Sequence, residues 1–129
     1  MIKFKHEIDR KMFGELNVFL LMVFTDFAVY AKEKHDWDIV VTDTISTLQE
    51  DINIGRKSDS HRLGISLDFR TRDVDTWVLQ DCVDYIENKP EYEKYKYLSF
   101  SGKKRFIYLH DSGHGHHGHF QIHKKYATQ

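Results

Sequence analysis

Residues 61–70 read HRLGISLDFR, and the second half of this stretch predicts a sheet-based fold. From residue 65 to 70 apolar and polar side chains alternate, which is the period of two of a strand with one buried and one polar face. Gly64 permits a tight turn directly before the strand. His61, on that turn, is thus able to fold back towards Asp68, which lies on the polar face. We expect a core strand whose polar face carries a histidine–aspartate pair.

A second alternating stretch, HGHHGHFQIH, lies near the end of the chain at residues 114–123 and contains most of a histidine cluster. Six of the nine histidines lie between His110 and His123. The alternation predicts a strand over residues 117–124, with Gly118, Phe120 and Ile122 on one face and His117, His119, Gln121 and His123 on the other. The rise of ~3.3–3.4 Å per residue places His117 and His119 about 7 Å apart on their shared face.

The remaining segments predict one α+β domain over residues 1–129. Apolar residues at helical spacing, β-branched runs and the Ser101-Gly102 turn predict the following elements: helices at 9–34 and 74–88, strands at 38–44, 94–100 and 103–110, and a polar loop at 45–60 with room for a short helix. The strand connections are mostly too short for parallel crossovers, which need a dozen or more residues. We therefore expect a mostly antiparallel sheet of about four strands, with helices packed on one face.

Composition narrows the classes of protein. The 129 residues are 40% hydrophobic, which is enough for a core, and the formal net charge of −1 gives no case for nucleic acid as a partner. The single cysteine, Cys82, excludes an internal disulfide and a cysteine-based zinc site. The longest apolar run, Val18–Phe24, is far below the ~20 residues of a membrane span, and charges of both signs near the start do not resemble a signal peptide. We expect a soluble protein made in a cytoplasm, without membrane insertion.

Two histidines and an aspartate from separate segments predict a zinc site. Three protein ligands leave a fourth position for water, as in catalytic rather than structural zinc sites. Each half of the pattern has a plainer interpretation: His61 and Asp68 as a loop histidine and a solvent-facing strand residue, and the glycine–histidine run as a loose metal binder. The sequence continues the strand pattern beyond that run, which makes a purification-tag scar a poor explanation.

The two motifs together resemble one family. His61-x-x-Gly64-x-x-x-Asp68 resembles the H-x-x-G-x-x-x-D signature of the LAS-type zinc peptidases, which include D-Ala-D-Ala carboxypeptidases and dipeptidases, murein endopeptidases, phage L-alanyl-D-glutamate endolysins and the Hedgehog signalling domain. The ending HGHFQI, residues 117–122, resembles their last core strand. The resemblance covers residues 39–122 and implies a Hedgehog- or DD-peptidase-like fold.

The resemblance also implies roles for individual residues. The zinc ligands would be His61, Asp68 and His119, and His117 would be the general base or transition-state stabiliser. His114 matches a further active-site histidine of some relatives. His116 stands where other branches have an acid, so the identity of the base is open among four residues: His117, His116, His114 and Asp111. The substrate-binding arginine of the family is missing just after the strand at 38–44, and Arg56 and Arg70 are the candidates to replace it.

The function that this resemblance implies is a zinc-dependent peptidase of bacterial peptidoglycan. It would hydrolyse stem peptides or cross-bridges with metal-activated water. Such an enzyme would be endolysin-like, held in the host cytoplasm before release to the cell wall, or carried in a virion. Two other functions stay open: a non-catalytic zinc-stabilised binding or virion-structural module of the same fold, and a nickel- or copper-handling protein that uses the histidine-rich stretch.

Overall fold

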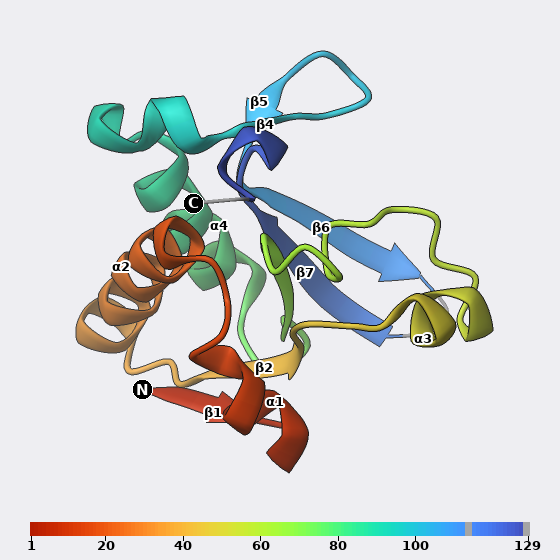
Figure 1. Ribbon diagram of the computed structural model, residues 1–129. Coiled ribbons are helices and arrows are strands. Elements are labelled where there is room, and N and C mark those ends of the chain that lie inside the picture. The colour runs from red at the N-terminus through yellow and green to blue at the C-terminus, as the bar shows by residue number, and fades with distance from the viewer. Residues whose placement is uncertain (113–114, 128–129) are drawn as a thin grey trace.

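The computed structural model describes residues 1–112 and 115–127, with the backbone alone at residues 111, 112 and 115. Figure 1 shows a sheet with its helices and connecting segments. Along the chain the elements are β1 (Ile2–Phe4), α1 (Glu7–Phe13), α2 (Val18–His35), β2 (Ile39–Asp43), α3 (Leu48–Asn53), β3 (Ser66–Arg70), α4 (Thr76–Glu87), the 3₁₀ helix η1 (Pro90–Tyr95), β4 (Tyr97–Leu98), β5 (Lys104–Arg105), β6 (Ile107–Ser112), β7 (Gly115–Gln121) and the 3₁₀ helix η2 (Lys124–Tyr126). The predicted α+β class is confirmed.

The main sheet has five strands in the order β1-β2-β3-β7-β6 and is mixed. β1 pairs with β2 in parallel, and the other neighbours pair antiparallel. The prediction of a mostly antiparallel sheet of about four strands was therefore wrong. It missed β1, which has only three residues and is too short for its alternation to stand out. The connection from β1 to β2 contains α1 and α2, which makes it long enough for a parallel crossover.

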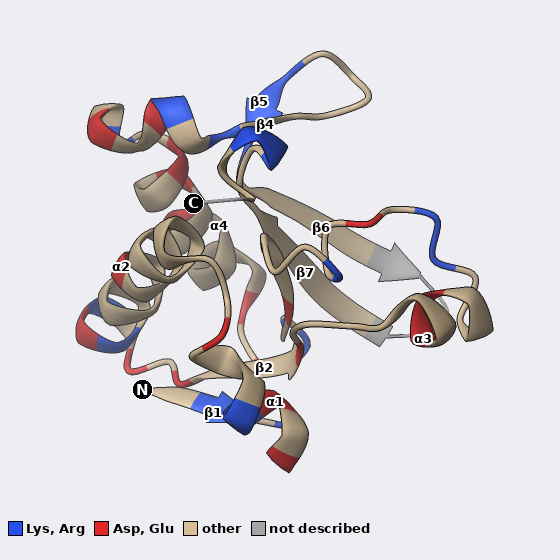
Figure 2. Cartoon of the chain, in the orientation of Figure 1, with Lys and Arg blue, Asp and Glu red and all other residues tan. Residues whose placement is uncertain are grey.

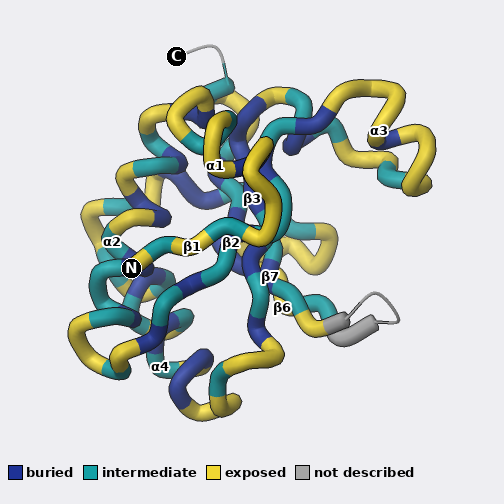
Figure 3. Tube along the Cα trace, turned by 90° about the horizontal axis from the view of Figure 1, so that it is seen from below, coloured by how far each residue is buried: buried dark blue, intermediate teal, exposed yellow. Residues whose placement is uncertain are grey.

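The core lies between the sheet and the helices α2 and α4. The apolar residues predicted for the inner faces of β3 and β7 are buried, and Phe69 and Phe120 lie against Phe24 and Phe27 of α2 with ring centroids 5.3–6.3 Å apart. Figure 3 shows buried positions along the central strands and exposed ones on the connecting loops. The predicted alternation is confirmed on both strands, so their polar residues are left on the opposite face of the sheet.

The predicted helix over residues 9–34 was wrong as a single element. It is divided into α1 and α2, whose axes differ by 116°. Asn17 begins α2: its side-chain oxygen accepts from the Phe19 backbone N–H at 2.9 Å, and its amide donates to the Tyr126 carbonyl at 2.6 Å. The apolar stripe continues across the break, so helical spacing alone does not reveal it. Within the described chain no single helix is long and apolar enough to cross a membrane. Only α1 and α2 taken together have the required length and apolar content, and this pair is bent.

A partly buried acid, Asp26, joins α2 to α4 and to the segment after it. Asp26 accepts hydrogen bonds from Tyr85 at 2.7 Å, Tyr92 at 2.8 Å and Lys89 at 3.0 Å. Burial opposes ionisation of Asp26, but these three donors outweigh it and hold the pKa of the carboxyl below its ordinary value.

The predicted helix over residues 74–88 is confirmed as α4, slightly shorter than expected.

The secondary structure around the β4–β5 hairpin differs from the prediction. The strand expected over 94–100 is mostly wrong, because η1 continues to Tyr95 and only β4 forms a strand. The expected turn at Ser101-Gly102 does connect β4 to β5, and the strand expected over 103–110 is divided into β5 and β6. The short helix allowed for in the loop at 45–60 exists as α3, which begins with a capping box between Thr47 and Glu50.

Candidate metal site

Three predicted ligands come together on the polar face of the sheet. One ligand atom each from His61, Asp68 and His119 lies within 4.8 Å of the other two. Asp68 and His119 are direct cross-strand partners in the β3–β7 register, while His61 comes from the turn before β3. The turn is closed by hydrogen bonds from the Gly64 N–H to the His61 carbonyl and from the Ile65 N–H to the Ser60 carbonyl. Gly64 adopts a φ of +70°, as a tight turn requires.

His61 is buried and held in one orientation. Its Nδ1 lies 2.7 Å from the Thr44 carbonyl oxygen, which can only accept, so Nδ1 carries the proton. Nε2 is then the nitrogen with the free lone pair in the neutral ring. It is buried, lacks a hydrogen-bond partner among the described residues, and lies 3.4 Å from Asp68 Oδ1. An imidazole fixed through one nitrogen, with the other facing a carboxylate, fits the donor set of a divalent metal.

Asp68 is the negative centre of the cluster. Burial disfavours its charge, but the hydrogen bond with His119 and the close imidazole of His61 outweigh that cost and hold the pKa of Asp68 well below its ordinary value. The carboxylate therefore stays ionised throughout the neutral range. For His61, burial likewise opposes the charged form, yet the neighbouring Asp68 prevails and the pKa of the imidazole is raised. A metal ion held by these three groups would compete with protons for their ligand atoms.

His119 is positioned from both sides. Its Nδ1 lies 3.0 Å from Asp68 Oδ1 and its Nε2 lies 2.8 Å from the side-chain oxygen of Gln121. Gln121 is two residues further along β7 and shares the polar face. Its contact with Nε2 leaves Nδ1 as the nitrogen directed at the cluster. Gln121 thus has an orienting role that the sequence analysis did not assign.

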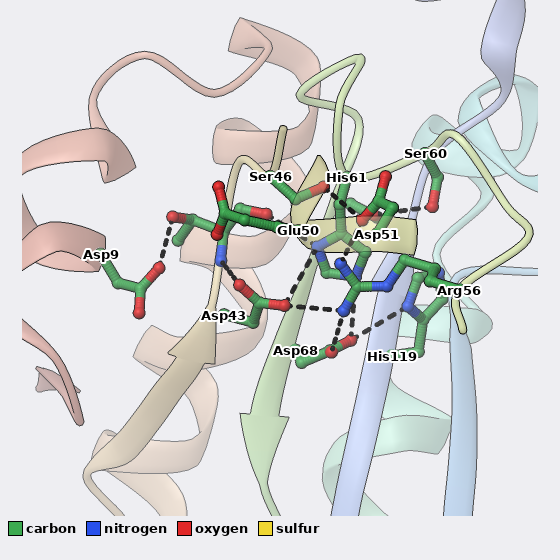
Figure 4. A network of polar contacts seen from close by, with 12 residues as sticks. Asp9, Asp43, Ser46, Glu50, Asp51, Arg56, Ser60, His61, Asp68 and His119 are labelled. Carbon is green, nitrogen blue, oxygen red and sulfur yellow. Dashed lines mark hydrogen bonds and ion pairs between the residues drawn. The ribbon is translucent and has the colours of Figure 1, made fainter. Parts of the chain in front are cut away.

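Arg56 lies at this cluster, but acids already surround its guanidinium. Its Nη1 donates to Asp51 at 2.9 Å, its Nη2 donates to Asp43 at 2.7 Å, and Asp68 is 3.8 Å away (Figure 4). Asp43 reaches this face because the β2–β3 register shifts between Val41 and Asp43. Regular alternation would have turned Asp43 to the same side as the buried Val41. The arginine predicted to bind substrate is therefore held mainly by the protein's own carboxylates.

A cleft of about 920 Å³ opens above the cluster. His61, Asp68 and His119 line it together with the segment at 54–60 and the β4–β5 hairpin. Arg70, the other arginine predicted to bind substrate, is not among the lining residues; it lies two residues beyond Asp68 on β3, opposite His117.

The structure distinguishes the candidates for the general base by their positions relative to the cleft. His117 lines the cleft on the same face of β7 as His119. His116 is exposed, does not line the cleft, and its carbonyl accepts from the Thr71 N–H at 3.2 Å. His114 and the side chain of Asp111 lie outside the described residues. Of the candidates whose side chains are described, His117 is the one beside the three ligands.

His110 and Tyr108 also line the cleft, although the sequence analysis gave neither a role. Each is opposite a β7 histidine in the sheet: Tyr108 pairs with His119, and His110 pairs with His117. The His110 and His117 rings stack with centroids 4.6 Å apart. Burial, together with the nearby His117 and His119, holds the pKa of His110 below its ordinary value. Alternation along β6 could have placed both on the polar face, but their pairing with β7 depends on the strand register.

Comparison of the chain with protein-family models, with curated proteins and with solved structures gives no match.

Proposed function

We propose that this protein is a zinc-dependent peptidase that hydrolyses peptide bonds in bacterial peptidoglycan. The observation that carries the proposal is the convergence of His61, Asp68 and His119 at the floor of a cleft, with the buried Nε2 of His61 facing the ionised carboxylate. Two imidazoles and one carboxylate form a typical ligand set of catalytic zinc. The resemblance of the two motifs to LAS-type peptidases points to peptidoglycan as substrate and to a Hedgehog- or DD-peptidase-like fold.

Zinc at this position would polarise the scissile carbonyl and lower the pKa of a bound water to roughly 7. The chain's own residues have complementary tasks. The Thr44 carbonyl and Gln121 orient His61 and His119, so the ligands are placed before the metal arrives. His117, on the cleft-lining face next to His119, is placed to take and return a proton. We propose it as the general base.

A zinc-stabilised module without hydrolytic activity is the second candidate. The observation that favours it is the engagement of Arg56 by Asp43 and Asp51, which leaves that arginine poorly placed to bind substrate. Under either proposal the metal site is the same. Under the first, we also propose an endolysin-like location: the host cytoplasm before release to the wall, or a virion.

Digestion of purified sacculi with the zinc-loaded protein, followed by mass spectrometry of the products, tests the proposal. We expect soluble muropeptides whose new ends identify the bond that is cut, and their loss with a chelator or with His119→Ala. His116→Ala is the matched control, because it removes an exposed imidazole from the same strand and should retain activity.

Metal stoichiometry in the same preparations separates the alternatives. One tightly bound zinc per chain without muropeptide release would refute the enzyme and support the module. Several metal ions per chain, unaffected by Asp68→Ala, would instead support nickel or copper handling.

A further inference from the structure

We infer that Arg105 of β5 selects the substrate by binding a carboxylate carried a few residues from the scissile bond. This inference rests on the proposed peptidase function and concerns recognition rather than bond cleavage. Peptidoglycan stem peptides carry free carboxylates beside their amide bonds, so an anion-binding residue in the cleft would distinguish them from neutral peptides. Arg105 was not among the arginines that the sequence indicated.

The charges in the cleft point to Arg105. Three cationic residues line it: Arg56, Lys57 and Arg105. Arg56 is already paired with acids. Arg105 instead donates from Nη2 to two hydroxyls, those of Ser99 at 3.2 Å and Ser101 at 3.0 Å. Within the described part of the chain we find no acid in ion-pair contact with it.

Glu87, an acid whose charge interacts with Arg105, is already engaged by the backbone. The Glu87 carboxylate is close enough for Arg105 to lower its pKa slightly, although burial dominates and the pKa is raised. Its oxygens accept the backbone N–H groups of Phe106 and Ile107 at 2.9–3.1 Å. Glu87 therefore holds the start of β6 and leaves the guanidinium of Arg105 for a carboxylate from outside.

Arg105 is also held in a defined position. It pairs with Tyr97 across the β4–β5 hairpin, and its guanidinium carbon is 5.8 Å from the centroid of the Tyr108 ring. The two serine hydroxyls fix one edge of the guanidinium. A planar group fixed in this way loses little freedom when it binds a carboxylate, whereas Lys57 is an exposed point charge on a flexible stem. Figure 2 shows the basic residues of this hairpin.

The distance from the metal cluster indicates which substrate residue carries the carboxylate. Tyr108 lies opposite His119, and Arg105 precedes Tyr108 by three residues. At ~3.3 Å per residue, Arg105 is at most about 10 Å from the cluster along the strand direction. An extended peptide has the same rise, so the recognised carboxylate belongs to a residue two or three positions from the scissile bond.

A pair of synthetic stem peptides tests the inference: one with the free carboxylate at that position and one with the carboxylate amidated. We expect the zinc-loaded wild type to cleave the acid form roughly 10- to 100-fold more efficiently in kcat/KM, the range of a charge-assisted hydrogen bond. Arg105→Gln should remove this preference by lowering kcat/KM for the acid form to the level of the amidated form. Arg105→Lys should restore part of it. Lys104→Gln is the matched control, because it neutralises the neighbouring exposed cation, which does not line the cleft.

Binding without turnover separates failure of this inference from failure of the proposed function. Calorimetry with analogues in which a methylene replaces the scissile carbonyl reports the carboxylate preference even if nothing is cleaved. A preference that depends on Arg105, without cleavage by wild type, would refute the peptidase and retain the anion site. An equal preference in wild type and Arg105→Gln, with circular dichroism showing both folded, would overturn the inference. So would the absence of any preference in wild type.

Discussion

Replacement of Gly118 by alanine should destabilise the protein and disturb the metal cluster together. Gly118 lies between His117 and His119 on β7 and pairs with Phe69 of β3. A Cβ atom added there would lie 2.4 Å from Cζ and 2.5 Å from Cε1 of the Phe69 ring. Ordinary carbon–carbon contacts are ~3.5–4.0 Å, so one of the two strands or the ring has to move by about 1 Å.

The ring has no empty space to move into. Phe69 is fully buried, and the rings of Phe24, Phe27 and Trp37 surround it with centroids 5.4–6.5 Å away. Overpacking of this kind costs about 1–3 kcal/mol and occasionally more, and we expect a value near 3 kcal/mol because the obstacle is a rigid aromatic ring. At about 4 °C per kcal/mol for a chain of this size, the melting temperature should fall by roughly 12 °C.

Urea and thermal unfolding in the presence of a chelator measure the effect without a contribution from metal. Gly14→Ala is the control: its φ is −67° and no atom lies within 4 Å of the added Cβ, so its stability should be unchanged or up to about 1 kcal/mol higher. Zinc affinity of the Gly118 variant should also fall, since Asp68 and His119 are the adjacent pair in the register. A Gly118→Ala protein within 0.5 kcal/mol of wild type, with unchanged zinc affinity, would refute the packing argument.

Three further predictions concern residues that do not line the cleft. Asn17→Ala removes the N-cap of α2 and the bond to the C-terminal segment, and should lower the free energy of unfolding by about 1–2 kcal/mol in urea titrations; a loss below 0.3 kcal/mol would contradict this role. The folded-state pKa of Asp26 is depressed, so its stabilising contribution should be complete above the unfolded pKa and disappear as pH falls through the folded pKa. The stability difference between wild type and Asp26→Asn should therefore shrink below pH ~4, and a constant difference down to pH 2 would count against it. Burial, and to a smaller degree Asp81, raises the pKa of the Cys82 thiol to about 12, so thiol reagents should label the native protein far more slowly than the urea-unfolded chain; equal rates would show that the thiol is accessible.

The two motifs predicted the candidate ligands because strand alternation is a local property. Asp68 falls on the polar face of its strand and His119 on the polar face of another, whatever the rest of the chain does. The same period places Phe69 and Phe120 in the core. For the same reason the α+β class follows from residue patterns alone, since each apolar face needs a layer to cover it.

Other features depend on contacts between distant segments, which no local pattern reports. The β3–β7 register makes Asp68 and His119 direct partners, and a shift of one residue would have turned one of them into the core. The irregular register at Asp43 brings an acid to Arg56 and occupies the arginine that the sequence indicated for substrate. The break before α2, the parallel strand β1 and the hairpin that carries Arg105 likewise arise from packing and loop closure. Residue alternation therefore assigned side chains to faces, whereas the free energy of packing those faces together set which side chains meet.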